Sequence, residues 1–94
     1  MIYSLGALRD LERIEDFFGD DTAGSRRALG RIFDVIALLR SSPELGRPVS
    51  TRLRELVISR GPTGFLALCR FDARFDLVRV LRLRHQKEAG YPGA

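Results

Sequence analysis

The strongest constraint on the fold is a change of hydrophobic period partway along the chain. Between residues 7 and 40, apolar residues recur at the three-to-four spacing of one helix face. From residue 52 to residue 85 they alternate with polar residues or run nearly continuously, as in strands. Helices followed by strands predict an α+β fold, in which a helix hairpin packs on a small antiparallel sheet.

Two helices are expected in the first half. Ser4 is a good N-cap for a helix over about residues 7–18, and Asp21 or Thr22 caps a second helix that ends near Arg40, before Pro43. A short connection makes the pair an antiparallel hairpin. The apolar faces expected to pack on the sheet are Leu8, Leu11, Ile14, Phe17 and Phe18 in the first helix, and Leu29, Ile32, Phe33, Ile36 and Leu39 in the second.

Strands are expected over residues 1–5, 52–60, 65–72 and 77–85, with a hairpin turn at Gly61–Gly64. The nearly continuous apolar and arginine run of the last segment indicates a central strand that is covered on both faces. The element order is therefore β-α-α-β-β-β. All 94 residues are expected to form one domain, with residues 86–94 a flexible polar tail.

Composition excludes several kinds of protein. No apolar run approaches the ~18 residues of a membrane span, and residues 1–5 are too short for the apolar region of a signal peptide, so secretion is not expected. One cysteine, Cys69, rules out an internal disulfide and fits the cytoplasm; its strand position predicts a buried core thiol. A single histidine and a single cysteine cannot form a structural zinc site, and no phosphate-binding glycine loop is present, so neither metal nor cofactor is expected.

Positive charge is concentrated in the second half of the chain. Residues 47–87 hold ten basic and three acidic residues, an excess of +7 within a total of +4. This asymmetry indicates an anionic partner, either nucleic acid or an acidic protein. Two alternatives are a solvated basic surface and a general bias toward arginine, since all but one of the 16 basic residues are arginine.

A candidate site lies on and just beyond the strands. Arg54, Arg70 and either Arg82 or Arg84 are expected on one sheet face, where guanidinium groups bind phosphates and stabilise charge. His85 is a candidate acid or base, and Tyr91 a candidate proton donor or stacking group. The alternatives are a basic groove for an acidic peptide and a histidine that merely ends a strand.

Five segments, in order, resemble the RelE/ParE toxin family. The opening resembles its A-x-x-D-L-x-x-I helix, the loop after the hairpin its P-x-x-G-x-P, and the first later strand the L-R-E-L of the ParE branch. The next strand resembles its Y-R dipeptide, and the last its H-Q-R/K ending. The segments are Ala7–Ile14, Ser42–Pro48, Leu53–Leu56, Leu68–Phe71 and Val80–Lys87.

The resemblance implies the toxin of a type II toxin–antitoxin pair, with a role in plasmid stabilisation. Its partners would be a cognate antitoxin, in a toxin–antitoxin hetero-oligomer, and either DNA gyrase (ParE branch) or ribosome-bound mRNA (RelE branch), with no membrane. The L-R-E-L strand and the missing lysine cluster of RelE favour gyrase inhibition without catalysis. An mRNA endonuclease and an inactive antitoxin-binding member are the alternatives.

Residue roles follow from the same resemblance. Arg70 matches the strand arginine of the nuclease branch, His85 the basic residue at its strand end, and Tyr91 the tyrosine near its C-terminus. Cys69 replaces the usual strand tyrosine, which affects packing and not catalysis. The catalytic set, should the chain be RelE-like, is Arg54, Arg70, His85 and Tyr91; the set expected to bind target or partner is Arg52, Arg54, Arg60, Arg82 and Arg84.

Overall fold

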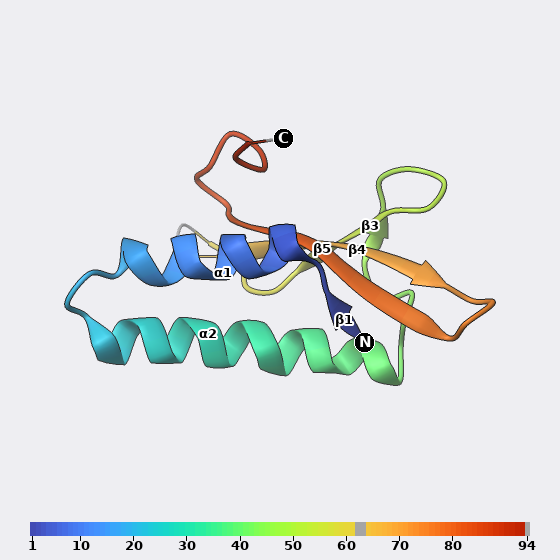
Figure 1. Cartoon of the computed structure of the whole chain (residues 1–94), viewed down its shortest axis with the longest axis horizontal. Coiled ribbons are helices and arrows are strands. Elements are labelled where there is room, and N and C mark those ends of the chain that lie inside the picture. Colours follow the sequence, from blue (N-terminus) through green and yellow to red (C-terminus); the bar gives the residue numbers. More distant parts are fainter. Residues whose placement is uncertain (62–63, 94) are drawn as a thin grey trace.

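Within residues 1–61 and 64–93, which the computed structural model describes, two α-helices pack on a five-stranded sheet (Figure 1). The helices are α1 (Leu5–Phe17) and α2 (Thr22–Ala37), the latter extended by one 3-10 turn, Leu38–Arg40. The strands are β1 (Ile2–Tyr3), β2 (Arg47–Pro48), β3 (Arg54–Val57), β4 (Phe65–Asp72) and β5 (Leu77–His85), in the order β1-β5-β4-β3-β2. The expected α+β architecture is confirmed.

Both helix starts follow the expected capping. The Ser4 hydroxyl accepts a hydrogen bond from the Ala7 N–H at 3.1 Å, and the Asp21 carboxylate accepts one from the Gly24 N–H at 2.9 Å. The connection turns at Gly19, whose φ of 54° favours glycine. No helix in the described part of the chain is both long and apolar enough to cross a membrane.

The sheet departs from expectation in three places. β1 runs parallel to β5, so the sheet is mixed and not purely antiparallel. The strand expected over 52–60 is shorter, because the Val49 N–H bonds the Leu53 carbonyl at 2.9 Å and closes a turn just before Arg54. β2 was not expected, since two residues that include a proline carry no alternation. Residues 62–63 of the hairpin turn expected at Gly61–Gly64 lie outside the described residues, and so does Ala94.

β4 and β5 have the predicted bounds, but a bulge lies between them. Leu68 pairs with Arg82 while Cys69 pairs with Val80, so Leu81 has no partner on β4. A bulge reverses the alternation of faces along the strand. As a result Val80 and Leu83, which are three positions apart and would lie on opposite faces of a regular strand, are both fully buried against the helices.

The buried face of each helix is narrower than the apolar face expected from the sequence. Ile14, Ile32, Ile36 and Leu39 are buried as expected. Leu8, Phe17 and Phe33 were wrongly placed in the core: they are 47%, 80% and 44% exposed, because a small sheet covers only the centre of each apolar stripe.

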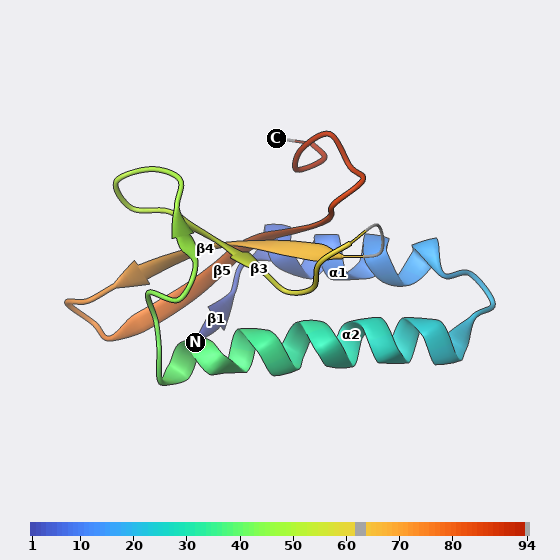
Figure 2. The ribbon, with the colours of Figure 1, turned by 180° about the vertical axis from the view of Figure 1, so that it is seen from behind.

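The sheet lies between α2 and the C-terminal segment. Figures 1 and 2, seen from opposite sides, both show α2 along one side of the sheet and residues 86–93 on the other. α1 runs along β5, at the edge that β1 pairs only over Arg79 and Val80. We call the sheet face that packs on the helices the inner face and the opposite one the outer face.

Candidate functional site

A buried carboxylate joins α1 to β5. Asp10 is 2% exposed and accepts hydrogen bonds from Arg82 Nε (2.7 Å), the Leu83 N–H (2.8 Å) and Arg13 Nη1 (2.5 Å). Burial alone raises the pKa of Asp10, but these three donors outweigh it and lower that pKa below its ordinary value. The carboxylate is therefore held ionised and bridges two elements that are 72 residues apart in the sequence.

Beyond its pairing with β1, the outer edge of β5 forms further hydrogen bonds with side chains. Ser4 Oγ donates to the Leu81 carbonyl (2.7 Å) and Arg13 Nη2 to the Leu83 carbonyl (3.2 Å). The His85 N–H donates to Glu88 Oε1 (2.8 Å). Glu88 also pairs with Arg13 at 2.9 Å. An exposed strand edge invites pairing with other chains, and here donors and acceptors from α1 and the tail occupy it.

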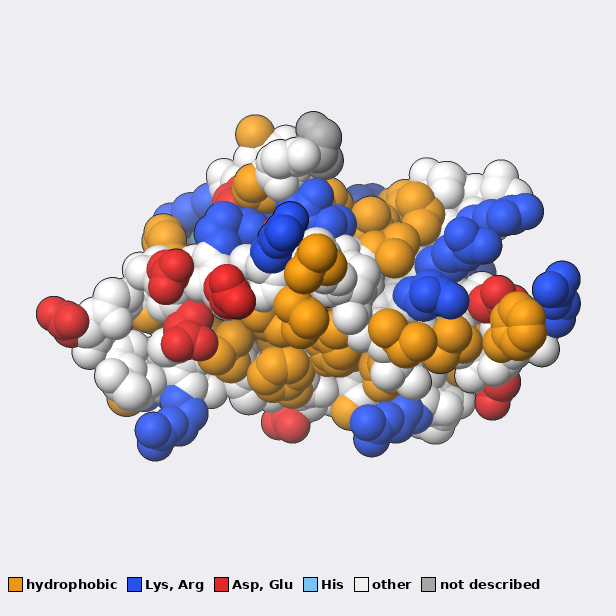
Figure 3. Space-filling view, viewed as in Figure 1, with side chains coloured by type: hydrophobic (Ala, Val, Ile, Leu, Met, Phe, Trp, Pro, Cys, Tyr) orange, Lys and Arg blue, Asp and Glu red, His pale blue; other side chains and the backbone are white. Residues whose placement is uncertain are grey.

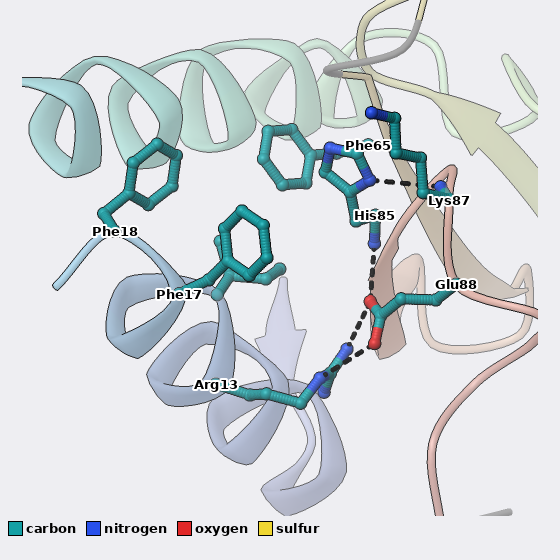
Figure 4. A pocket seen from close by; sticks show the side chains of 8 residues that line it. Arg13, Phe17, Phe18, Phe65, His85, Lys87 and Glu88 are labelled. Carbon is teal, nitrogen blue, oxygen red and sulfur yellow. Dashed lines mark hydrogen bonds and ion pairs between the residues drawn. The ribbon is translucent and has the colours of Figure 1, made fainter.

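His85 lines a largely apolar pocket of about 390 Å³ (Figure 4). Its ring stacks on Phe17, with centroids 6.0 Å apart, and meets the edge of Phe65 at 5.3 Å. Nδ1 accepts a hydrogen bond from the Lys87 N–H at 3.1 Å, so the proton of the neutral ring resides on Nε2. Since Phe65 belongs to the core cluster, this ring lies on the inner side of the sheet.

Tyr91 lies on the outer face, where it covers a charged cluster. Its hydroxyl donates to Glu55 Oε2 at 2.9 Å, and Arg47 donates to Glu55 Oε1 at 2.7 Å. The guanidinium carbons of Arg82 and Arg84 lie 5.7 and 5.4 Å from the Tyr91 ring centroid. Burial and the bond to Glu55 raise the pKa of Tyr91, so it is a neutral phenol with its proton engaged. The segment expected to be a flexible tail thus packs on the sheet through Tyr91.

The other expected arginines lie in separate places. Arg54 is opposite Cys69 in the register, on the inner side, and donates to the carbonyls of Glu44 (3.1 Å) and Gly46 (2.8 Å). Arg70 is on the outer face, directly opposite Arg79 of β5. Arg52 and Arg60 are exposed at either end of β3.

The four candidate catalytic residues are therefore not brought together. Arg54 and His85 lie on the inner side, opposite Cys69 and Phe65, at different points along β4. Arg70 and Tyr91 lie on the outer face, with Tyr91 bound to Glu55. The expectation that Arg54 and Arg70 share a face is wrong, because they are one residue out of phase in the register.

Sequence reasoning missed the residues that organise this region. Asp10 was visible only as one letter of the A-x-x-D-L segment and Glu55 only as one letter of the L-R-E-L strand. Neither motif indicates a partner for its acid, and no motif singles out Glu88. Cys69 was interpreted correctly: it is 4% exposed, and burial raises the pKa of its thiol to about 12, as for an unreactive core cysteine.

Comparison with known proteins agrees with the fold. A solved structure described as "Chromosomal ParDE TA system from P. aeruginosa" superimposes with a TM-score of 0.59 and 22% identity, covering 88% of this chain and 90% of that one. No curated protein matches the sequence. The family model for the ParE toxin of the parDE type II toxin–antitoxin system matches residues 1–90. Since that match spans nearly the whole sequence, the chain belongs to the ParE toxin family of type II toxin–antitoxin systems.

Proposed function

We propose that this ParE-family toxin inhibits DNA gyrase by binding it, without catalysis of its own, and that a cognate antitoxin neutralises it in the cytoplasm. The observation that carries the proposal is the dispersal of the nuclease candidates. A general acid or base acts within about 3 Å of the proton it transfers. Here His85 and Tyr91 lie on opposite faces of the sheet, and the Tyr91 proton is held by Glu55.

The test is expression of the toxin with and without its antitoxin, read out by growth, plasmid supercoiling and transcript mapping. Two variants accompany the parent protein: His85→Ala and Tyr91→Phe. We expect gyrase–DNA complexes to accumulate, and both variants to remain toxic at folded levels equal to the parent. Leu38→Ala, at an exposed site, is the control for expression.

Other outcomes assign the alternatives. Codon-specific transcript cuts that disappear with either variant would establish the mRNA endonuclease. Growth unaffected by the parent protein at normal folded levels, with a stable antitoxin complex, would establish an inactive antitoxin-binding member.

The antitoxin is expected on the helix hairpin and a sheet edge. Leu5, Leu8 and Phe33 are 62%, 47% and 44% exposed on the helices, and Figure 3 shows hydrophobic side chains gathered between α1 and α2. Exposed apolar patches of this kind are typical of protein interfaces. The positive excess of residues 47–87 favours an acidic partner.

A charge placed in this patch tests the surface. Leu8→Arg should weaken the antitoxin complex at least tenfold in calorimetry, because it buries a charge in an apolar contact. Phe75→Arg, an equal change at a 63% exposed site on the far β4–β5 turn, should not. A complex that buries less than ~1,000 Å² in total would contradict stable neutralisation by this route.

A further inference from the structure

The outer face of the sheet holds a second cluster of arginines that the proposed function does not use. Arg52, Arg70 and Arg79 line one open pocket of about 710 Å³, together with Ser50, Thr51 and the apolar floor of Leu53 and Leu81. Figure 2 shows the loop around residues 49–53 standing beside β4 and β5. None of the three guanidinium groups forms an ion pair or hydrogen bond with any residue in the ranges 1–61 and 64–93.

This arrangement opposes the ordinary rules of sheet stability. Arg70 and Arg79 are directly opposite each other on neighbouring antiparallel strands. Like charges in that position repel and destabilise the sheet, and Arg52 adds a third charge to the same pocket. Side chains that break such a rule without local compensation are expected at functional sites. An anion placed between the guanidinium groups removes the repulsion.

The nearest carboxylate on β4 does not fill this role. Asp72 lines an adjoining hollow that Arg52 and Arg70 also line, but it forms no ion pair with either of them in the described residues and accepts a hydrogen bond from the backbone N–H of Arg74 at 3.1 Å. The pocket formed by Arg52, Arg70 and Arg79 itself has no acidic side chain in its lining.

We propose that Arg52, Arg70 and Arg79 form a binding site for the phosphodiester backbone of nucleic acid. The side chains in the lining that can hydrogen-bond are guanidinium groups and the hydroxyls of Ser50 and Thr51, the donor set of phosphate contacts. Guanidinium groups bind phosphate oxygens bidentately. The pocket contains no amide side chain or aromatic ring that would read or stack a base, so binding is independent of sequence.

The lining of the pocket favours a phosphodiester over an acidic peptide. Arg79 pairs with strands on both sides, β1 and β4, whereas Arg70 pairs only with β5, because the ladder between β3 and β4 ends at Cys69. An acidic peptide also brings backbone N–H donors, and the side chains of the lining offer them only the hydroxyl oxygens of Ser50 and Thr51. A phosphodiester has only acceptor oxygens, which is what a lining of donors requires.

The experiment measures fluorescence anisotropy of a labelled DNA duplex of about 20 base pairs, titrated with the purified toxin over a range of salt concentrations. Arg70→Gln and Arg79→Gln should each weaken binding about tenfold, as expected for the loss of one charge-assisted bond. Each should also lower the slope of log K against log salt by about one. Arg31→Gln, which removes the same charge from the exposed side of α2, should change affinity less than twofold and leave the slope unaltered.

Two further arms identify the source of the phosphate and the alternative ligand. If a single-stranded RNA binds as tightly as the duplex and the variants lose the same affinity for it, the site binds any phosphodiester backbone. If only the duplex binds, the site is supported and its ligand is DNA. Equal salt slopes for parent, Arg70→Gln and Arg79→Gln would overturn the site. The site would also be overturned if the toxin bound neither the DNA duplex nor the RNA but bound polyglutamate, and if the arginine variants lost that binding. Arg52→Gln, in an exposed loop, keeps the test decisive should a strand variant unfold. These readouts are independent of toxicity, so the gyrase proposal stands or falls separately.

Discussion

The two halves of the outer sheet face use the same residue type in opposite ways. Toward the end of β5, Arg82 and Arg84 both have partners: Arg82 binds the buried Asp10, Arg84 donates through Nη1 to the Glu88 carbonyl while its Nε stays without a hydrogen bond in the described residues, and Tyr91 covers the two. Toward its start, Arg70 and Arg79 face each other without an acid between them. An arginine with partners fixes the structure, whereas an arginine without partners leaves its charge available to a ligand.

The largest loss of stability is expected when Asp10, the buried acid of the half around Arg82 and Arg84, is replaced. Asp10→Asn leaves Arg82 and Arg13 without their buried counter-charge, which typically costs about 3–5 kcal/mol. Urea unfolding followed by circular dichroism measures the loss. Asp34→Asn, an exposed change on α2, should stay within about 0.5 kcal/mol. A comparable loss in both variants would mean that Asp10 does not organise this half.

Acid should remove part of the same stabilisation. Burial opposes ionisation of Asp10, Glu55 and Glu88, but arginine and N–H or O–H donors lower the pKa of each carboxyl below its ordinary value. A lowered folded-state pKa contributes stability above the ordinary pKa of about 4, and that stability is lost as pH falls through the lowered value. We expect the free energy of unfolding to fall below about pH 5, and to fall less steeply in Asp10→Asn. An unchanged slope in that variant would contradict the assignment.

The stabilisation contributed by Tyr91 has two parts, the hydrogen bond of its hydroxyl and the packing of its ring. Tyr91→Phe removes the hydrogen bond to Glu55 and keeps the ring over Arg84, so we expect a loss of about 0.5–1.5 kcal/mol in thermal or urea unfolding. Tyr91→Ala removes the ring as well and should lose more. Equal values for the two variants would indicate that the ring adds nothing to the cover.

The smallest expected effect has the opposite sign. Arg79→Gln relieves the repulsion with Arg70 and should stabilise the protein by about 0.2–1 kcal/mol. Arg84→Gln, the matched change in the partnered half, breaks the bond to the Glu88 carbonyl and should destabilise it. Loss of stability in both variants, measured side by side, would erase the distinction between the halves.

The sequence predicted the helices and strands better than the candidate site. Helices and strands depend on patterns among neighbouring residues, whereas the site depends on contacts between residues far apart in the chain. β4 and β5 were bounded correctly, since alternation and apolar continuity are local properties. The bulge at Leu81 has no local signature, and it alters which side chains of β5 face the core. The pairing of Asp10 with Arg82 joins positions 72 residues apart, and neither spacing nor composition specifies it.

The placement of β5 also bears on how the toxin is made. Its first residues are held by its last ones: β1 pairs with β5, Asp10 needs Arg82 and the Leu83 N–H, and Arg13 needs Glu88. A nascent chain that ends before β5 has its helices, but Asp10 keeps only Arg13 as a partner and lacks Arg82 and the Leu83 N–H, and the core is incomplete. Folding therefore waits until the last strand has left the ribosome, because contacts this distant in sequence form late. We therefore expect a chain truncated before β5 to remain unfolded and to lose its action as a toxin.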